Sequence, residues 1–573
     1  MAPRQGFREQ MARRRFLRLS AGGAVAFPLL LEACSPAPTS APGAINASAT
    51  TTAGGPPVAA TRARGRVTLP TYVAFQGPKP DLPATAEGVS AGFFHFPPKD
   101  QLVQSVKDTP GTGGDINAFT VTYNPPGPAL ESNPAWQEIN KRLGARLNIN
   151  AVPFADFIVK FNTILSSGDL PDIIYYHPSV NLANLTDWLK SSCADLTPYL
   201  SGDAVKDYPN LANLPPSNAK TFTVYNDGIY GVHNPKGSVF ALGMFVHQEM
   251  LDGLGVAQIK NSDDFKRVAT QLTNASAGRY ALGGSSTGGP LGFFAQMFRA
   301  PNVWKYENGH LTRDIETEEY KEAVAYTRDL IAGGMVYPDV PSTSLNGAKP
   351  LFVNGTFAAL YDGFPAFIAY YDMFQVDPSY KLRTIRPFAF DGGQPVYYTG
   401  NSGVGPVFFK KASPDRIKEL LRVLNFLAAP FGTTEYLLNM FGVEGTDFTY
   451  SSEGDPTLTD QGKADTLVQW TYVMRAPDAL YHPGAPDYAQ VWHDEEVAHL
   501  STAVDDPTAP YTPLSPSYGK QNGPLTQMLL DRSTDILWGR APVSSWDQVV
   551  QDWRSQGGDA IRSELEQVMG GNA

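Results

Sequence analysis

Hydrophobic and polar positions follow two different periods in the first third of the chain. Residues Ala118–Tyr123 and Arg146–Val152 alternate apolar and polar side chains, as half-buried strands do. Residues Asn133–Leu143 and Phe154–Ser167 place their apolar side chains at helical spacing. The continuous apolar run Asp172–Tyr176 is typical of a strand that is covered on both faces. This β-α-β-α-β order predicts an α/β fold in which helices cover a parallel sheet.

Three later segments also have a helical pattern. Thr317 can cap a helix that ends at Gly333–Gly334, and Ser413 can cap a second one. The second helix has its apolar residues on one stripe, and a third helix near the C-terminus has a stripe with two tryptophans. These stripes consist of Ile417, Leu420, Leu421, Leu424 and Leu427, and of Trp546, Val549, Val550 and Trp553. We expect both stripes to pack in the core.

The N-terminus has the pattern of an export signal. Three arginines at Arg13–Arg15 precede the short apolar run Ala21–Leu31, which is too short to span a bilayer. Paired arginines before Phe-Leu resemble a twin-arginine signal. Leu-x-Ala-Cys at Leu31–Cys34 resembles a bacterial lipobox, in which Cys34 is acylated. We therefore predict a lipoprotein signal peptide at residues 1–33; the alternative is a plain secretory signal in which Cys34 is incidental.

Composition and net charge exclude some classes of protein. The chain has 573 residues, a net charge of −11 and 42% hydrophobic residues, which excludes a wholly disordered chain and disfavours a nucleic-acid binder. Residues 34–66 are rich in Ala, Pro, Thr, Ser and Gly, so we predict a flexible tether. For residues 67–114 we predict an extended segment that lies on the body. If Cys34 carries lipid, Cys193 is the only free thiol and is expected to be buried.

Several motifs, in order along the chain, carry a family resemblance. They are the GDLPDII stretch Gly168–Ile174, Asp227–Val232, Phe245–Gly255, Ala300–Trp304, Phe352–Leu360, Phe441–Gly445 and the terminal stretches Gly539–Trp546 and Trp553–Gly558. From about residue 115 to the end, the chain resembles the extracellular solute-binding proteins of carbohydrate ABC importers. It is most similar to their branch of LipO-like and aldouronate-binding lipoproteins. His247 and Thr356 depart from the cationic residues usual in that family.

The resemblance implies a two-lobed fold of the periplasmic-binding-protein type (type II). Each lobe is discontinuous in sequence, hinge strands join the two lobes, and the ligand lies between them. The implied boundaries are 115–236 and 401–450 for lobe one, and 237–400 and 451–573 for lobe two. Such proteins close around the ligand by a hinge motion.

The best candidate ligand-binding residues follow the ends of parallel strands, because ligands bind beyond the carboxyl ends of such strands. This rule and the resemblance select Tyr176, His177, Tyr361, Asp362 and Phe364; Trp304 after Pro301-Asn302, and Tyr398 and Asn401 near the expected hinge, complete the set. Core packing stays open for Tyr176 and Trp304, and a turn-capping role before Gly363 stays open for Asp362. Period two favours only one of Tyr175 and Tyr176 as core. Three further sets are weighed: His233, the aromatic residues Trp470, Tyr481 and Trp492 as far subsites, and Arg383 and Arg386 as partners of a uronic acid.

The sequence disfavours an enzyme. It has no Gly-x-Ser-x-Gly elbow, no His-Glu-x-x-His motif and no phosphate-binding loop, and a carboxylate pair among so many acids is uninformative. We expect a monomeric lipoprotein on the outer face of the bacterial cytoplasmic membrane, without cofactor, metal or catalytic residues. Its expected partners are an oligosaccharide and an ABC permease. The alternatives are a peptide or other non-sugar ligand, a surface adhesion or sensor protein, and a secreted glycosidase.

Overall fold

The computed structural model describes residues 67–570 except 86–87, 124, 181, 183, 216–222, 237–241, 287–288, 376, 401–402 and 469. The predicted signal peptide, the tether, Cys34 and Asn401 therefore lie outside the described residues. Two sheets organise the described chain, and each has its own hydrophobic core. Within the described part of the chain, no helix combines the length and the apolar character needed to cross a bilayer.

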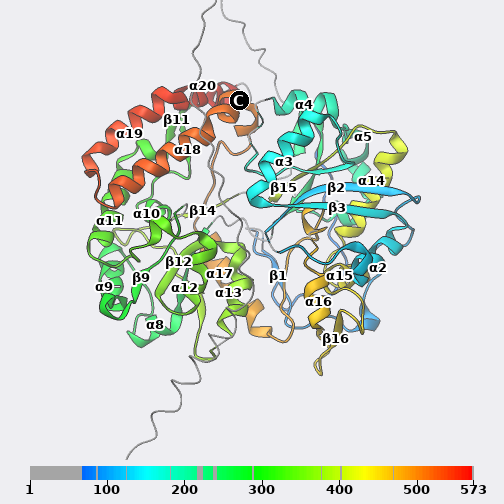
Figure 1. The fold of residues 1–573 in the computed structure, drawn as a ribbon, viewed down its shortest axis with the longest axis horizontal. Coiled ribbons are helices and arrows are strands. Elements are labelled where there is room, and N and C mark those ends of the chain that lie inside the picture. Colours follow the sequence, from blue (N-terminus) through cyan, green and yellow to red (C-terminus); the bar gives the residue numbers. More distant parts are fainter. Residues whose placement is uncertain are drawn as a thin grey trace, which may run out of the picture. The chain divides into compact units, whose positions relative to one another are not determined.

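The first sheet is the one that the strand and helix periods predict. Its strand order is β3-β2-β4-β15-β7. These strands are β2 (Asp115–Thr122), β3 (Arg146–Pro153), β4 (Ile173–Tyr175), β7 (Gly231–Pro235) and β15 (Gly403–Phe409). β2 is parallel to β3 and β4, whereas β15 is antiparallel to β4 and β7. The α/β prediction is confirmed, since helices connect the three parallel strands as expected (Figure 1).

Helices of the first lobe begin and end where local chemistry favours it. The side chain of Asn133 accepts a hydrogen bond from the Trp136 N–H at the start of α2, and Gly144 closes that helix with a φ of 62°. The helices are α2 (Pro134–Leu143), α3 (Phe154–Ser167), α4 (Leu185–Ser192), α5 (Thr197–Leu200), α6 (Pro209–Ala212), α14 (Pro414–Leu427), α15 (Thr434–Phe441) and α16 (Asp460–Asp465). The predicted stripe of α14 is buried, which confirms its packing role.

The second sheet is mixed and has the order β13-β8-β12-β9. Its strands are β8 (Leu242–His247), β9 (Tyr280–Leu282), β12 (Phe357–Gly363) and β13 (Leu382–Thr384). Its helices are α8 (Gln248–Gly253), α9 (Ser262–Leu272), α10 (Leu291–Met297), α11 (Glu318–Ala332), α12 (Leu345–Val353), α13 (Phe367–Phe374) and α17 (Pro486–Leu500). Short strand pairs complete the chain: β1 (Ala91–Gly92) with β18 (Ala479–Leu480), β5 (Val224–Tyr225) with β6 (Gly228–Ile229), β10 (Trp304–Glu307) with β11 (His310–Arg313), β14 (Tyr397–Tyr398) with β19 (Ala503–Val504), and β16 (Phe448–Tyr450) with β17 (Pro456–Leu458).

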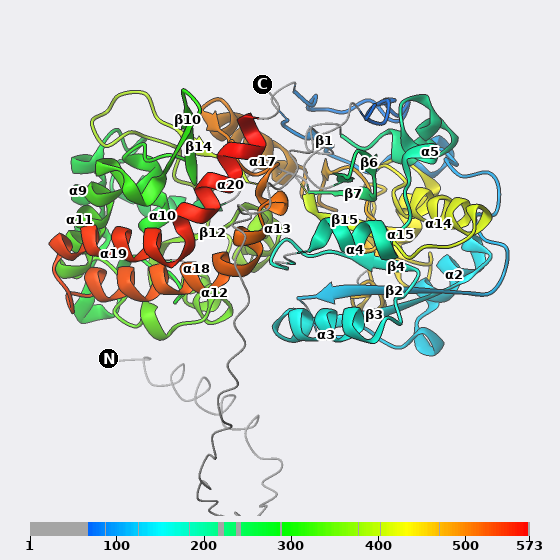
Figure 2. The ribbon, with the colours of Figure 1, turned by 90° about the horizontal axis from the view of Figure 1, so that it is seen from above.

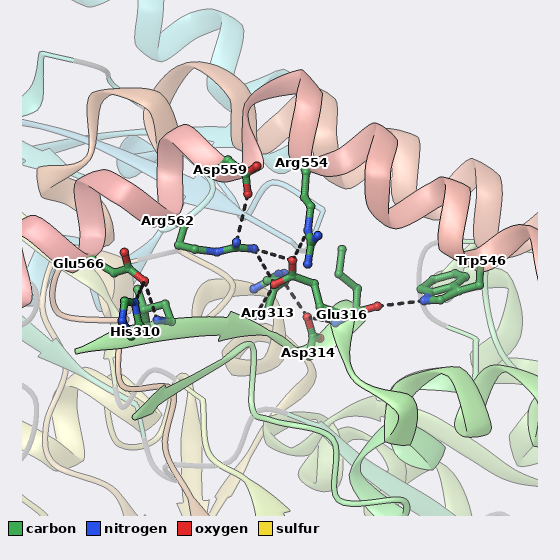
Figure 3. A network of polar contacts seen from close by, with 11 residues as sticks. His310, Arg313, Asp314, Glu316, Trp546, Arg554, Asp559, Arg562 and Glu566 are labelled. Carbon is green, nitrogen blue, oxygen red and sulfur yellow. Dashed lines mark hydrogen bonds and ion pairs between the residues drawn. The ribbon is translucent and has the colours of Figure 1, made fainter. Parts of the chain in front are cut away.

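The C-terminal helices α18 (Pro516–Leu537), α19 (Trp546–Trp553) and α20 (Asp559–Gly570) pack together and against α11 (Figures 1 and 2). The predicted stripe of α19 is buried, and the indole N–H of Trp546 donates to the Ile315 carbonyl at 2.9 Å. Glu316 accepts hydrogen bonds from Arg554 and Arg562, as Figure 3 shows. An ion-pair network therefore attaches the C-terminal helices to the chain between β11 and α11.

Residues 67–114 form few regular elements and lie along both lobes. Several backbone N–H groups of this segment donate hydrogen bonds to buried carboxylates, because they have no neighbouring strand to pair with. The pairs are Ser90 with Glu496, Phe96 with Asp455, Val106 with Glu435, and Thr112 with Glu419, at 2.8, 2.7, 3.1 and 2.7 Å. Burial raises the pKa of Glu496 to about 8. This segment contacts the first lobe near Thr112 and the second lobe near Ser90.

One expected boundary requires a correction. The implied second part of lobe two begins at residue 451, yet Val468, Trp470, Val473 and Met474 are buried in the core of the first sheet. The chain joins the second core only with Leu480 and α17. Apolar contacts with the first lobe therefore extend beyond residue 450. Cys193 is buried in that same core, and burial raises the pKa of its thiol to about 12.

Candidate functional site

Three aromatic residues lie where the parallel strands of the first sheet end. Tyr123 follows β2, Phe154 follows β3, and His177 follows β4 with one residue between. Tyr123 and Phe154 are 50% and 40% exposed, which is unusual for side chains of this size within a packed ring cluster. Because parallel strands end at one edge of the sheet, this position is where an α/β fold offers a ligand site.

These rings form one surface, which we call the aromatic platform: Tyr123, Phe154, His177 and Tyr472. The ring of Tyr123 lies 5.3 Å from Phe154 and 5.7 Å from Tyr472, and Phe154 lies 5.0 Å from His177, measured between centroids. Rings at these distances support one another, so the surface keeps its shape without a ligand. Aromatic faces of this kind suit the apolar faces of sugar rings.

His177 is neutral in this setting. The Ser179 N–H donates to its Nδ1 at 2.9 Å, so the ring proton is on Nε2, which donates to the Tyr123 hydroxyl oxygen at 2.7 Å. Burial lowers the pKa of His177 to about 4. The platform is therefore uncharged at neutral pH and orients the Tyr123 hydroxyl.

A pocket of about 150 Å³ joins the first lobe to the chain before and within α18. Its first wall consists of Tyr176, Pro178, Val180, Leu182, Leu185, Tyr225 and Pro406, and its second of Asp506, Ala509, Thr512, Pro513, Ser515, Tyr518 and Gly519. Asp506 is the only acid among these residues, and burial raises its pKa above the usual range. Its carboxylate accepts hydrogen bonds from the N–H and hydroxyl of Thr508, both at 2.8 Å. This pocket lies between lobes and offers apolar faces with an acceptor.

The strands that connect the lobes are adjacent to this region. β7 and β15 pair antiparallel, with a register shift between Gly403 and Gly405. Gly405 has a φ of 135°, and a Cβ there would come 2.3 Å from the Tyr176 carbonyl oxygen. The side chain of Asn234 donates to the Thr471 carbonyl at 3.1 Å, which connects β7 to the segment of Tyr472. Glycine at 405 thus permits the close approach of β15 to the Tyr176 backbone.

The structure brings Tyr176 to the wall of the pocket and His177 to the aromatic platform. The expectation that only one of Tyr175 and Tyr176 is core is wrong, since they are 1% and 7% exposed. β4 is covered on both faces, so both rings are buried. Tyr176 nevertheless lines the pocket, and its hydroxyl donates to the Val180 carbonyl at 2.8 Å.

The predicted ligand-binding residues of the second lobe are buried by packing and do not face a ligand. Tyr361, Asp362 and Phe364 are 7%, 6% and 0% exposed. The Asp362 carboxylate accepts a hydrogen bond from the Tyr370 hydroxyl at 2.6 Å. Tyr361 packs edge-on against Phe293. In this conformation α10 and α13 occupy the space that a ligand would need at the end of β12.

Other predicted residues also lie in cores or away from the platform. Trp304 is 3% exposed and packs against Trp553, so the structure brings it to the C-terminal helices. The hydroxyl of Tyr398 donates to the Ala300 carbonyl, and burial raises its pKa well above the usual range. The far-subsite residues Trp470, Tyr481 and Trp492 are all buried, as is His233 on β7.

Two further features of the described surface do not form part of the site. A hollow of about 760 Å³ follows the unpaired edge of β3 and the loop at Pro126–Glu131, and we attribute it to that open sheet edge. Ligand atoms of His95, Glu453 and Asp455 lie within 4.8 Å of one another. However, Asp455 already accepts hydrogen bonds from the Phe96 N–H and the Tyr481 hydroxyl, so its role is structural.

Sequence reasoning missed four of the residues found here: Tyr123, Phe154, Tyr472 and Asp506. The first two were assigned to a strand and a helix. Their position directly after parallel strands was the available signal, because side chains there can face a ligand. No pattern marked Tyr472 or Asp506, which come from irregular segments.

A family comparison decides what kind of protein carries this geometry. The family model described as bacterial extracellular solute-binding protein matches residues 127–432, which is more than half of the chain. The chain belongs to this family. Its members are binding proteins rather than enzymes, and the two-lobed fold predicted from the resemblance is confirmed.

Individual relatives agree with this assignment. The chain is 25% identical to the polygalacturonan/rhamnogalacturonan-binding protein YtcQ of Bacillus subtilis, over 82% of this chain and 94% of YtcQ. It is 23% identical to lipoprotein LipO of the same organism, over 80% of this chain and 93% of LipO. The N-glycan transport solute-binding protein NgtS of Streptococcus pneumoniae has a similar structure, with a TM-score of 0.58, 15% identity and coverage of 80% and 99% of the two chains.

Proposed function

We propose that this solute-binding protein captures an oligosaccharide between its lobes and delivers it to an ABC permease. The observation that carries this proposal is the exposed aromatic platform at the carboxyl ends of β2, β3 and β4. Sugars present apolar faces as well as hydroxyl edges, and a rigid ring surface beside hydrogen-bonding groups suits both. The glycan-binding names of YtcQ and NgtS support the same ligand class.

The two walls of the pocket supply a mechanism. Tyr176 lines the pocket from the first lobe, which also carries the platform, whereas Asp506, Thr512 and Ser515 line the opposite wall. A sugar unit in this pocket can contact Tyr176 and donate a hydroxyl proton to the Asp506 carboxylate only when both walls are close. The ligand therefore favours the closed form, which is the condition for a closure signal to the permease. ATP hydrolysis belongs to the transporter, since the chain has no phosphate-binding loop.

The test is binding to the purified protein. Titration with a panel of oligosaccharides, with peptides as controls, is expected to raise the thermal unfolding midpoint for one glycan class. Small-angle scattering is expected to show compaction, and mass spectrometry is expected to recover the ligand intact. A shortened ligand would establish a glycosidase instead. If peptides raise the unfolding midpoint and no glycan does, the fold assignment stands but the ligand is not an oligosaccharide.

We further propose that the protein is exported and anchored by a lipid on Cys34. The basic residues, short apolar run and Leu-x-Ala-Cys pattern support this, as does the lipoprotein relative LipO. The Cys34→Ala variant is expected to leave the membrane fraction and appear as soluble protein. If that variant sediments with membranes as completely as the parent chain, the anchor is disproved.

A further inference from the structure

The pocket lined by Tyr176 and Tyr518 contains one charged side chain. Among its lining residues, all of them within the described part of the chain, Asp506 is the only one that carries a charge at neutral pH. The others are apolar or have hydroxyl groups. The Asp506 carboxylate is held in place, because it accepts hydrogen bonds from the N–H and the hydroxyl of Thr508, both at 2.8 Å. An anion is therefore fixed in this wall, with no lining cation to balance it.

The charged groups behind this wall do not reverse its sign. Arg313 is the cation that acts favourably on Asp506, and Asp314 is the acid that opposes it. The Arg313 Nε lies 3.1 Å from the Asp314 carboxylate, so the charge of Arg313 is already paired (Figure 3). Together, Arg313 and Asp314 add no net positive charge near Asp506.

The aromatic platform supplies no free cation either, within the residues that the structure describes. His177 is neutral, since burial lowers its pKa to about 4. Arg475 acts electrostatically on the Tyr472 hydroxyl, but its guanidinium donates to the Asp478 carboxylate at 2.6 Å. The positive charge next to the platform is thus already matched by a resident acid.

The two arginines that the sequence suggested as partners of a uronic acid lie elsewhere. Arg383 and Arg386 line a separate pocket of about 360 Å³. The same pocket contains the carboxylate of Glu495, a residue that is 2% exposed, and both arginines act favourably on it. A resident carboxylate therefore already balances these arginines, and neither of them lines the pocket at Asp506.

We propose that Asp506 makes the pocket at Tyr176 select a neutral sugar unit and reject a uronic acid. A neutral sugar presents hydroxyl groups, which can donate protons to a carboxylate. The carboxylate of a uronic acid would instead lose its water next to a like charge, which disfavours the complex. The repulsion is strongest where both walls exclude water, so it acts against the closed form. This inference rests on the proposed function and adds the ligand class, a neutral oligosaccharide, to it.

The experiment compares matched neutral and acidic probes on the purified protein by calorimetry. One pair is cellotriose and its form oxidised to uronic acids at C6. The other is trigalacturonate and the neutral trisaccharide made by reducing its carboxyl groups to alcohols. In each pair that binds, the parent protein is expected to prefer the neutral member by about tenfold or more.

Asp506→Asn tests the residue itself, because it removes the charge and keeps an oxygen that can accept from Thr508. This variant is expected to lower the preference for the neutral probe by about tenfold. Asp531→Asn, which changes an exposed acid on α18, is the matched control and should leave the preference as it is. If Asp506→Asn does not fold, Asp506→Ser replaces it, since a serine hydroxyl can also accept from the Thr508 N–H.

Each other outcome has a definite meaning. Equal or tighter binding of an acidic probe by the parent protein overturns the selection but leaves glycan binding established. The role of Asp506 is overturned if the preference is the same in Asp506→Asn as in the parent. If the protein binds another glycan of the panel instead of these probes, a neutral one supports the proposal and an acidic one overturns it. A failure to bind any glycan overturns the proposed function itself.

Discussion

Replacement of Tyr123 by alanine is expected to weaken oligosaccharide binding by about tenfold or more, which corresponds to about 1.4 kcal/mol. Tyr123 contributes the most exposed ring of the platform, with half of its surface free, and it also contacts Phe154 and Tyr472. Its removal eliminates one stacking face and leaves neighbouring rings less well supported. The affinity of parent and variant for the same glycan, measured by calorimetry, gives the loss directly.

Two further variants separate the effect of ring stacking from that of the Tyr123 hydroxyl and from a general effect of replacing an exposed tyrosine. Tyr123→Phe keeps the ring and removes only the hydroxyl that accepts from His177, so it should retain most of the affinity. Tyr72→Ala is the matched control, because Tyr72 is 49% exposed but lies on the N-terminal segment, outside the platform. If Tyr123→Ala binds as well as Tyr72→Ala does, the platform is not the binding surface.

The fold of the first lobe was readable from the sequence because its signals are local. The alternating strand at Ala118–Tyr123, the helix that begins after Asn133 and the apolar run at Asp172–Tyr176 each carry their own period. Short connections then restrict how these elements can be joined. The chain near Trp470 was misplaced because it has no such period, and only its contacts with a distant core determine its lobe.

Only part of the candidate site could be predicted from the sequence. His177 and Tyr176 were found because they follow a buried strand, and the same rule applied to Tyr361 and Asp362 selected packed residues. The rule states where a strand ends but not which helix covers that end. For β12 the covering rings come from α10 and α13, and for Trp304 the covering ring is Trp553, far along the chain. Tertiary packing of this kind has no signal in a single local pattern.

The largest stability effect is expected at Glu316, at the centre of the C-terminal network (Figure 3). Its side chain is 4% exposed and accepts hydrogen bonds from the Arg313 N–H at 2.8 Å and from the Arg554 and Arg562 guanidinium groups at 2.6 and 2.5 Å. Burial alone would raise the pKa of Glu316, but these donors outweigh it and lower the pKa. The carboxylate is thus a charged group that three elements share.

Glu316→Ala is expected to reduce the free energy of unfolding by about 3 kcal/mol, because it removes the carboxylate that pairs with Arg554 and leaves Arg562 with the more exposed Asp559 in a partly buried site. The loss should appear in urea denaturation and as faster hydrogen exchange in α20, which holds Arg562. Asp547→Ala is the matched control. It removes the exposed ion pair with Lys321, in which Asp547 is 73% exposed, and should cost less than about 0.5 kcal/mol. Equal costs for the two variants, or a loss without faster exchange in α20, would show that the network does not hold the C-terminal helices in place.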